Sequence, residues 1–201
     1  MKTSYVLEMQ RHLSIFLKLL LFLSLDASAS KPEPSVAYIR KHAIEMDGSV
    51  DQAIISELSI HKVVIIGEMH GTTESPNFIL ALARMLVQNK KSVLIALEIP
   101  GSSQSATDEF VLNGQPDVLA QDNFFKRDYQ DGRSSQAMVA MLTGLRTLPS
   151  VHVYDFDTGP RVSDGADRDL KMAKNLVEQI QKAKPDITLV LTGNIHGKLR
   201  A

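Results

Sequence analysis

Cysteine and tryptophan are absent from this chain of 201 residues, and aromatic residues of all kinds make up only 5% of it. Without cysteine there is no disulfide, thiolate zinc site, iron–sulfur cluster or cysteine nucleophile. The scarcity of aromatic rings argues against a platform on which single-stranded nucleic acid stacks. Lys and Arg number 22 against 23 Asp and Glu, so the basic excess of a nucleic-acid-binding protein is also missing. We therefore expect no nucleic-acid partner.

The rest of the composition is that of an ordinary globular protein. Hydrophobic residues make up 44% and charged residues 22% of the sequence, with 11 glycines and 8 prolines. These proportions exclude collagen-like, low-complexity and intrinsically disordered classes. The length suits one domain with a sizeable hydrophobic core, which a protein without disulfides requires.

Residues 1–29 have the features of a secretory signal peptide. Lys2 and Arg11 supply positive charge, residues 15–25 are mostly apolar, and Ala27 and Ala29 have the small-x-small spacing of a cleavage site. The apolar run is about half of the ~20 residues that span a bilayer, which favours a cleaved signal over the alternative of an uncleaved membrane anchor. Cleavage leaves residues 30–201 as a single domain. Export without cysteine suits a bacterial periplasm, with membrane contact only through the signal segment.

Short β-branched runs alternate with amphipathic segments along the rest of the chain. The predicted strands are residues 62–67, 92–98, 151–156 and 187–192. The predicted helices are residues 35–59 with a break near 47–48, 76–88, 103–112, 134–148 and 167–184. This alternation predicts an α/β fold, with a mostly parallel central sheet of about four or more strands flanked by helices. Residues 113–133 are the least regular part and are predicted to form a long loop or lid.

Acidic, amide and imidazole side chains follow each of the four predicted strands. They are Glu68 and His70, then Glu98, then Asp155 and Asp157, and finally Asn194 and His196. Ligands of open α/β sheets bind outside the carboxyl ends of the strands. The sequence therefore predicts one site at this edge of the sheet, to which all four strands contribute.

The pattern Gly-x-x-His occurs twice, from Gly67 to His70 and from Gly193 to His196, each time directly after a strand. Glycine permits a tight turn and a close backbone approach, which brings the histidine to the mouth of the sheet. Two imidazoles with a glutamate can bind a divalent metal. Alternatively, one histidine acts as a general base on water while a carboxylate orients it. A purely structural alternative is that each histidine caps its own turn.

Several charged residues near these motifs have more than one interpretation. Glu98 closes an apolar strand as a metal ligand, as a base with a raised pKa, or as an ion-pair partner of Arg168 or Arg133. Arg168 opens the last long helix, where it clamps an anionic group or forms a surface ion pair. Glu74 precedes a helix, where the helix dipole alone favours an acid.

Four motifs in this order resemble a known superfamily. They are residues 64–74 (VIIGEMHGTTE), residues 96–100 (ALEIP), Arg168 with residues 172–175 (MAKN), and residues 193–196 (GNIH). As a set spread over residues 62–197, they resemble the superfamily that joins erythromycin-esterase-like proteins, ChaN-like haem-uptake proteins and the Tiki/TraB proteins. The resemblance implies an α/β fold with its site at the strand ends.

Each branch of that superfamily implies a different use of the same residues. The esterase-like branch implies water activation by His70, supported by acids such as Glu68 and Glu98. The Tiki-like branch implies a divalent metal, with His70, Glu98 and His196 as its ligands. The ChaN-like branch implies haem at an oligomer interface. The chain departs from these relatives because it lacks a lipoprotein cysteine, is shorter than the esterases, and stops soon after Gly197, where relatives continue; we expect a C-terminal truncation.

The sequence therefore predicts a periplasmic hydrolase-like protein that acts on a small-molecule or peptide substrate, with or without help from Zn, Mn or Co. The predicted catalytic residues are Glu68, His70, Glu98, Arg168 and His196. The predicted cofactor-binding residues are Glu74, Arg133 and Asn194. The alternative is a ChaN-like protein that binds haem or an iron cofactor for uptake, and an oligomer is compatible with either prediction.

Overall fold

The computed structural model describes residue 50 and residues 52–127, 131–159 and 165–196. These residues belong to one compact unit, Met46–Lys198. The predicted signal peptide, the predicted helical residues 35–49 and the chain end after residue 196 lie outside the described residues.

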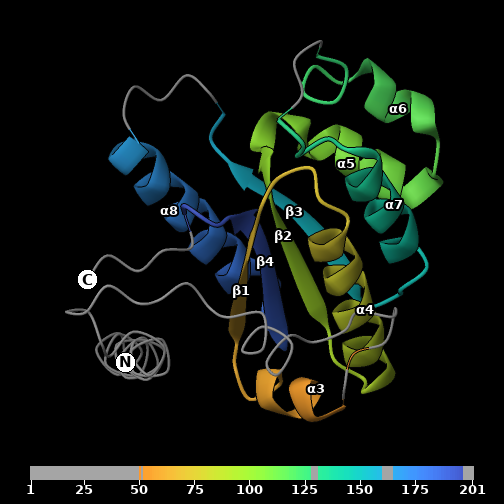
Figure 1. Ribbon diagram of the computed structural model, residues 1–201, viewed down its shortest axis with the longest axis vertical. Coiled ribbons are helices and arrows are strands. Elements are labelled where there is room, and N and C mark those ends of the chain that lie inside the picture. Colours follow the sequence, from red (N-terminus) through yellow and green to blue (C-terminus); the bar gives the residue numbers. More distant parts are fainter. Residues whose placement is uncertain (1–49, 51, 128–130, 160–164, 197–201) are drawn as a thin grey trace, which may run out of the picture. The chain divides into compact units, whose positions relative to one another are not determined.

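Four parallel strands form the central sheet in the order β1-β4-β2-β3 (Figure 1). The strands are β1 (Val63–Glu68), β2 (Val93–Pro100), β3 (Val151–Asp157) and β4 (Ile187–Gly193). Each begins and ends within two residues of its prediction. Every residue of the inner strands β2 and β4 is buried, which explains why both read as continuous apolar runs rather than as alternating patterns.

Helices flank the sheet, and those described lie at the predicted places except for α6. They are α3 (Gln52–Leu58), α4 (Glu74–Gln88), α5 (Gln104–Asn113) after the 3₁₀ turn η1 (Gly101–Ser103), α6 (Pro116–Gln121), α7 (Gln136–Leu145) and α8 (Gly165–Ala183). The predicted α/β fold is confirmed. At α7, Ser135 is the N-cap and accepts a hydrogen bond from the Met138 N–H.

The prediction of one long loop over residues 113–133 is wrong in part, because α6 lies inside it. Pro116 stands in the first turn of this helix, where its fixed φ is already helical and no N–H is needed. Leu119 is the buried residue of the helix. A helix of six residues has too few turns to show a hydrophobic period, so the sequence pattern does not reveal it.

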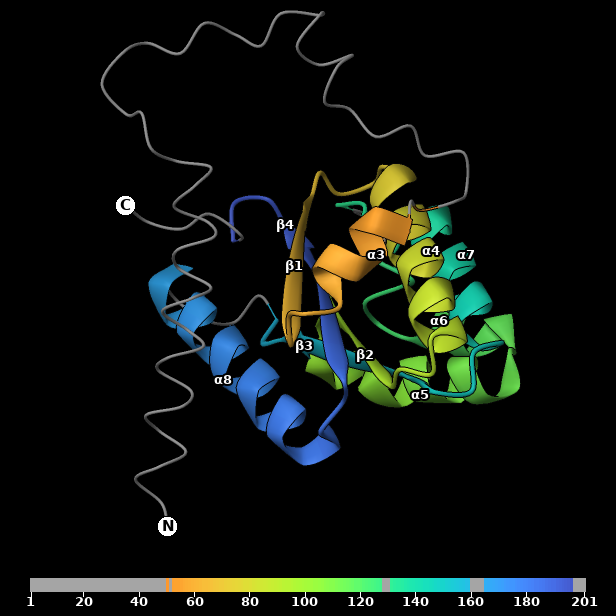
Figure 2. The same cartoon turned by 90° about the horizontal axis from the view of Figure 1, so that it is seen from below.

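Among the described helices, α8 covers one face of the sheet and α4, α5 and α7 cover the other (Figure 2). The larger core lies under α4 and α7, whose fully buried side chains are Ile79, Leu82, Leu86, Met141, Leu142 and Leu145. A smaller cluster under α8 joins Met172 to Ala96, Phe156 and Val190. Burial of each large side chain contributes about 1.5–3 kcal/mol, so both layers hold the sheet in place.

The two layers decide where a ligand can bind. The chain leaves β2 into α5 on one face of the sheet and leaves the neighbouring β3 into α8 on the other face. Where neighbouring parallel strands send their connections to opposite faces, a crevice opens at their carboxyl ends. Within the described ranges, none of the helices combines the length and apolar character needed to cross a bilayer.

Candidate functional site

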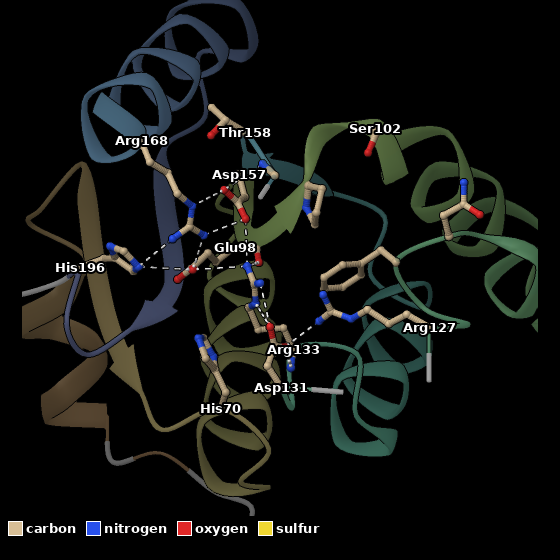
Figure 3. A pocket seen from close by; sticks show the side chains of 14 residues that line it. His70, Glu98, Ser102, Arg127, Asp131, Arg133, Asp157, Thr158, Arg168 and His196 are labelled. Atoms are coloured by element: carbon tan, nitrogen blue, oxygen red, sulfur yellow. Dashed lines mark hydrogen bonds and ion pairs between the residues drawn. The ribbon is translucent and has the colours of Figure 1, made fainter. Parts of the chain in front are cut away.

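A cavity of about 870 Å³ lies at the carboxyl edge of the sheet. Its wall includes His70, Glu98, Arg133, Asp157, Arg168 and His196, which converge from separate strands, loops and α8 (Figure 3). The predicted site at the strand ends therefore coincides with a real pocket. Five of these six residues are among the predicted site residues, and Asp157 is the addition.

His70 is held by the last residue of β1. Its Nδ1 donates a hydrogen bond to Glu68 Oε1 at 2.8 Å, and the Glu68 side chain is only 3% exposed. The hydrogen bond to Glu68 raises the pKa of His70 against the opposing effect of burial. Because Nδ1 carries the shared proton, the other ring nitrogen, Nε2, is the one that remains to accept a proton.

The two Gly-x-x-His motifs pack against each other. Glu68 and Gly193 are partners in the parallel register of β1 and β4, and the Asn194 N–H donates to the Glu68 carbonyl at 2.9 Å. A Cβ built on Gly193 would lie 3.0 Å from His70 Nε2, closer than ordinary side chains approach. The glycine of the second motif thus makes room for the histidine of the first, and both histidines line the cavity.

Glu98, at the end of β2, is fully engaged in hydrogen bonds. Its Oε2 accepts from the Thr192 hydroxyl at 2.7 Å and the Gly193 N–H at 2.8 Å. Its Oε1 accepts from Arg168 Nη2 at 2.9 Å and Arg133 Nη1 at 3.4 Å. Burial raises the pKa of this carboxyl, but the hydrogen bonds outweigh burial and the pKa is lowered. The interpretation of Glu98 as a base with a raised pKa is therefore wrong, and the ion-pair alternative is the one observed.

Asp157, at the end of β3, joins both arginines. Its Oδ2 accepts from Arg168 Nη2 at 2.8 Å and Arg133 Nη1 at 2.9 Å, while Oδ1 accepts from Arg168 Nε at 3.0 Å. Burial opposes ionisation, yet the two guanidinium groups lower the pKa of this carboxyl. The sequence shows acids at 155 and 157 after the same strand, and strand periodicity alone does not tell which of them enters the site.

Arg133 and Arg168 reach the two carboxylates from opposite faces of the sheet. Arg133 comes from the loop before α7, and Arg168 from the first turns of α8. Their side chains are 13% and 20% exposed, so Arg168 forms an ion pair that is largely buried rather than at the surface. The hydrogen bond to Asp157 raises the pKa of Arg168 above its ordinary value. Both arginines are permanently charged here.

His196 extends this network behind Arg168. Its Nδ1 lies 2.8 Å from Asp169 Oδ1, and its Nε2 lies 3.1 Å from Arg168 Nη1. The carboxylate accepts the Nδ1 proton, so neutral Nε2 accepts from the guanidinium. The chain Asp169–His196–Arg168 therefore fixes Arg168. Asp169 is a residue that sequence reasoning missed, although it stands beside Arg168 on the same helix.

Two of the three predicted metal ligands, Glu98 and His196, are engaged with other groups in this arrangement. Both Glu98 oxygens accept hydrogen bonds, and His196 Nε2 faces the Arg168 guanidinium. In the part of the chain that the structure describes, no group of three or more His, Asp or Glu residues is arranged to hold a metal ion. A cation between Glu98 and His196 would have to displace a guanidinium of the same sign. The donor set thus does not fit a metal as arranged, and the metal hypothesis stays a prediction.

Three predicted site residues do not line the cavity, and of these Glu68 lies directly behind His70. Glu74 is exposed in the first turn of α4, where its charge suits the helix dipole. Asn194 is also exposed, and its backbone N–H serves the turn through Glu68. Asp131 and Arg127, which the sequence did not indicate, do line the cavity. They belong to the segment between α6 and α7.

Comparison with known proteins adds a fold relative. No family model matches this chain. No curated protein matches it either. The solved structure of the type III effector HopBA1 is similar over 70% of each chain, with a TM-score of 0.53 and 13% sequence identity. At this identity the likeness concerns the fold alone.

Proposed function

We propose that this protein is a hydrolase in which His70 activates a water molecule without a metal ion. The observation that carries the proposal is the His70–Glu68 pair. A buried carboxylate at 2.8 Å holds Nδ1, so Nε2 is the proton acceptor, and it stands in a cavity beside two arginines. This is the arrangement of a general base with its orienting group.

The reaction that suits these groups is hydrolysis of a carbonyl compound such as an ester or amide. Water loses one proton to His70 Nε2 as its oxygen bonds to the carbonyl carbon, and the C=O electron pair moves onto the carbonyl oxygen. Collapse of this tetrahedral intermediate expels the leaving group, which takes the proton from protonated His70. Glu68 stabilises the imidazolium that forms between the two steps.

The negative charge on the carbonyl oxygen needs fixed donors. A guanidinium has five N–H groups. In Arg168, the Nε–H and one Nη2–H donate to Asp157, the other Nη2–H donates to Glu98, and one Nη1–H donates to His196. One Nη1–H group of Arg168 therefore remains. In Arg133, the Nε–H and one Nη2–H donate to Asp131, and the two Nη1–H groups donate to the Glu98 carbonyl and to Asp157. One Nη2–H group of Arg133 therefore remains. These counts cover contacts among the described residues. Donors that are already fixed cost little reorganisation as charge develops.

His196 then differs in function from His70. Its neutral Nε2 accepts from Arg168, so we assign it to holding that arginine rather than to water activation. Glu98 and Asp157, both ionised, hold the two guanidinium groups in place. Eight of the fourteen residues that line the cavity are acidic, arginine or histidine, which favours hydrolysis over the apolar cleft that the haem alternative requires.

We also propose kinship with the esterase-like branch of the superfamily named above, and export through residues 1–29. The support for kinship is the ordered motif set together with the position of His70 at a strand end. The support for export is the charge, apolar run and small-residue spacing of the first residues. Mass spectrometry of the protein secreted by a bacterial host tests export, because a mature chain beginning at Ser30 is expected.

The test of the proposed function is hydrolysis of p-nitrophenyl acetate and of a p-nitroanilide by wild type, His70→Ala and His152→Ala. His152 is exposed on β3 and lies outside the cavity wall, so its variant is the matched control. We expect loss of at least about a hundredfold in His70→Ala and none in His152→Ala. Equal activity in all three proteins would overturn the proposal. Elemental analysis and haem titration of the same samples test the two alternatives.

A further inference from the structure

The cavity has a second wall that the proposed reaction does not use. It is formed by residues 122–127 and 131–132 of the segment between α6 and α7, beside Arg133. Phe124 is buried at its centre, and its N–H donates to Asp122 Oδ1 at 2.8 Å. Asp122 also accepts from the Ser103 hydroxyl at 3.0 Å, which ties the segment to the start of α5.

The Phe124 ring lies under two guanidinium groups. The Cζ of Arg127 is 4.3 Å from the ring centroid, and the Cζ of Arg133 is 5.5 Å from it. A cation over an aromatic face is attracted by the ring's quadrupole, and the attraction strengthens away from water. Phe125 meets Phe124 edge-on, with the two ring centroids 5.3 Å apart.

Asp131 holds the edge of the same arginine. Its Oδ2 accepts from Arg133 Nη2 at 2.8 Å and Nε at 3.1 Å, a two-pronged contact. Its Oδ1 accepts from Arg127 Nη2 at 2.8 Å and from the Arg133 backbone N–H at 3.1 Å. The hydrogen bonds from Arg133 hold the pKa of Asp131 well below its usual range despite its burial, so it stays ionised.

Gly132 anchors this wall to the catalytic turn. Its φ is +95°, and a Cβ at this position would overlap the backbone of His70 and Gly71. Only glycine fits both the backbone angle and the space. Asp131 and Arg133, on either side, are therefore carried to the turn that bears the proposed base.

Arg133 is thus held in three ways: at its face by Phe124, at its edge by Asp131, and at its tip by Glu98 and Asp157. An arginine side chain has many rotamers, and each restraint removes some of that freedom before substrate arrives. We propose that Phe124 and Asp131 are positioning residues that aim the remaining Nη2 N–H of Arg133 at the reacting carbonyl. This inference rests on the proposed hydrolase function.

The variants that test it are Phe124→Leu, Phe124→Tyr, Asp131→Asn and, as the matched control, Phe125→Leu. Phe124→Leu keeps an apolar side chain but removes the ring face, and Phe124→Tyr restores that face. Phe125→Leu removes the other aromatic ring of the pair and keeps the Phe124 face, over which both guanidinium groups lie. Urea unfolding of each variant shows whether the fold survives.

The first readout needs no activity. In a ¹H–¹⁵N spectrum, the Nε–H signal of Arg133 reports its order and its exchange with water. We expect faster exchange by about tenfold in Phe124→Leu and Asp131→Asn, and a wild-type signal in Phe124→Tyr and Phe125→Leu. Unchanged exchange in Phe124→Leu and Asp131→Asn would overturn the positioning role, whether or not the protein proves to be a hydrolase.

The second readout separates positioning from binding. With p-nitrophenyl acetate, we expect kcat to fall about tenfold in Phe124→Leu and Asp131→Asn, with KM within about twofold of wild type. Phe124→Tyr should recover kcat. A mobile Arg133 with wild-type kcat would overturn the catalytic part of the inference. If wild type and His70→Ala are equally inactive, the proposed function fails, and with it the catalytic part, while the exchange data still decide whether Phe124 and Asp131 hold Arg133.

Discussion

Gly193 and His70 occupy complementary space at the carboxyl edge of the sheet. Any side chain at Gly193 would begin with a Cβ 3.0 Å from His70 Nε2 and 3.3 Å from its Cε1. The backbone N–H of Gly193 meanwhile donates to Glu98. One residue therefore leaves room for the proposed base and binds the carboxylate that holds the two arginines.

Gly193→Ala should displace the His70 imidazole and reduce hydrolysis with little loss of stability. A shift of the ring by a few tenths of an ångström weakens its contact with Glu68 and misaligns Nε2, so we expect a fall in kcat of about ten- to a hundredfold. The free energy of unfolding should change by less than about 1 kcal/mol, because the neighbouring atom is a side chain near the cavity. Activity assays and urea unfolding of the same variant measure both quantities.

Gly101→Ala is the matched control for that experiment. A Cβ at Gly101 would make an ordinary contact, 3.4 Å from the Asp155 carbonyl oxygen, and touch none of the arginines. Its kcat should equal that of wild type. Equal loss of activity in both variants would mean that the Gly193 effect has nothing to do with His70.

Glu68→Gln should move the acidic limb of the pH–rate profile to lower pH. His70 accepts a proton only when it is neutral, so activity rises as pH passes upward through its pKa. Glu68 raises that pKa, and glutamine removes the charge, so the His70 pKa falls and the limb follows it downward. The plateau rate should also drop, because the amide no longer stabilises the imidazolium. If the acidic limb of the kcat/KM profile lies at the same pH in Glu68→Gln as in wild type, the assignment of His70 as the base is contradicted.

Arg168→Met should destabilise the fold strongly. It leaves Asp157 and Glu98, whose side chains are 1% and 3% exposed, with one guanidinium fewer between them. Removing one partner of a buried ion pair costs about 3–5 kcal/mol when the remaining charge is left without compensation. Here Arg133 still contacts both carboxylates, so two buried negative charges share one guanidinium. Adding Asp157→Asn to Arg168→Met should recover part of this loss in urea unfolding. A double variant as unstable as the sum of the two single variants would show that the pair is not coupled.

Asp155→Asn should change how stability depends on pH. Asp155 is 1% exposed on β3, and burial raises its pKa to about 7, although the Thr107 hydroxyl donates to it at 2.6 Å. Between pH 4 and 7 the unfolded chain releases a proton that the folded protein keeps, so wild type loses stability as pH rises through this range and then levels off. Asparagine does not titrate.

The stability that wild type loses through Asp155 as pH rises from 4 to 7 is at most roughly 4 kcal/mol. The free energy of unfolding of Asp155→Asn, relative to that of wild type, should therefore be higher at pH 8 than at pH 5. Urea unfolding of both proteins at the two pH values measures this difference. If the difference in unfolding free energy between the two proteins is the same at both pH values, Asp155 is already ionised in the folded state at pH 5.

The sequence by itself determined the order of strands and helices in the chain, the parallel α/β class and the edge of the sheet that carries the site. These follow from hydrophobic period and from chirality, which act over short stretches of chain. It also indicated His70, Glu98, Arg133, Arg168 and His196 as site residues. It named Asp155 and Asp157 at the same strand end without telling which of them enters the site. It missed α6, Asp131 and Asp169, since neither a short helix nor a lone acid has a distinctive local pattern.

Only the tertiary structure decided which charged side chains form ion pairs and hydrogen bonds with one another. The hydrogen bond from Gly193 to Glu98 joins residues 95 positions apart in the sequence, and the hydrogen bond from Arg168 to Glu98 joins residues 70 positions apart. Such pairs form when strands and layers pack, because a charged group leaves water only where the fold offers it a partner. That packing paired Glu98, a candidate base in the sequence, with two arginines, placed His196 beside Arg168, and joined His70 to Glu68 in the pair to which we assign water activation.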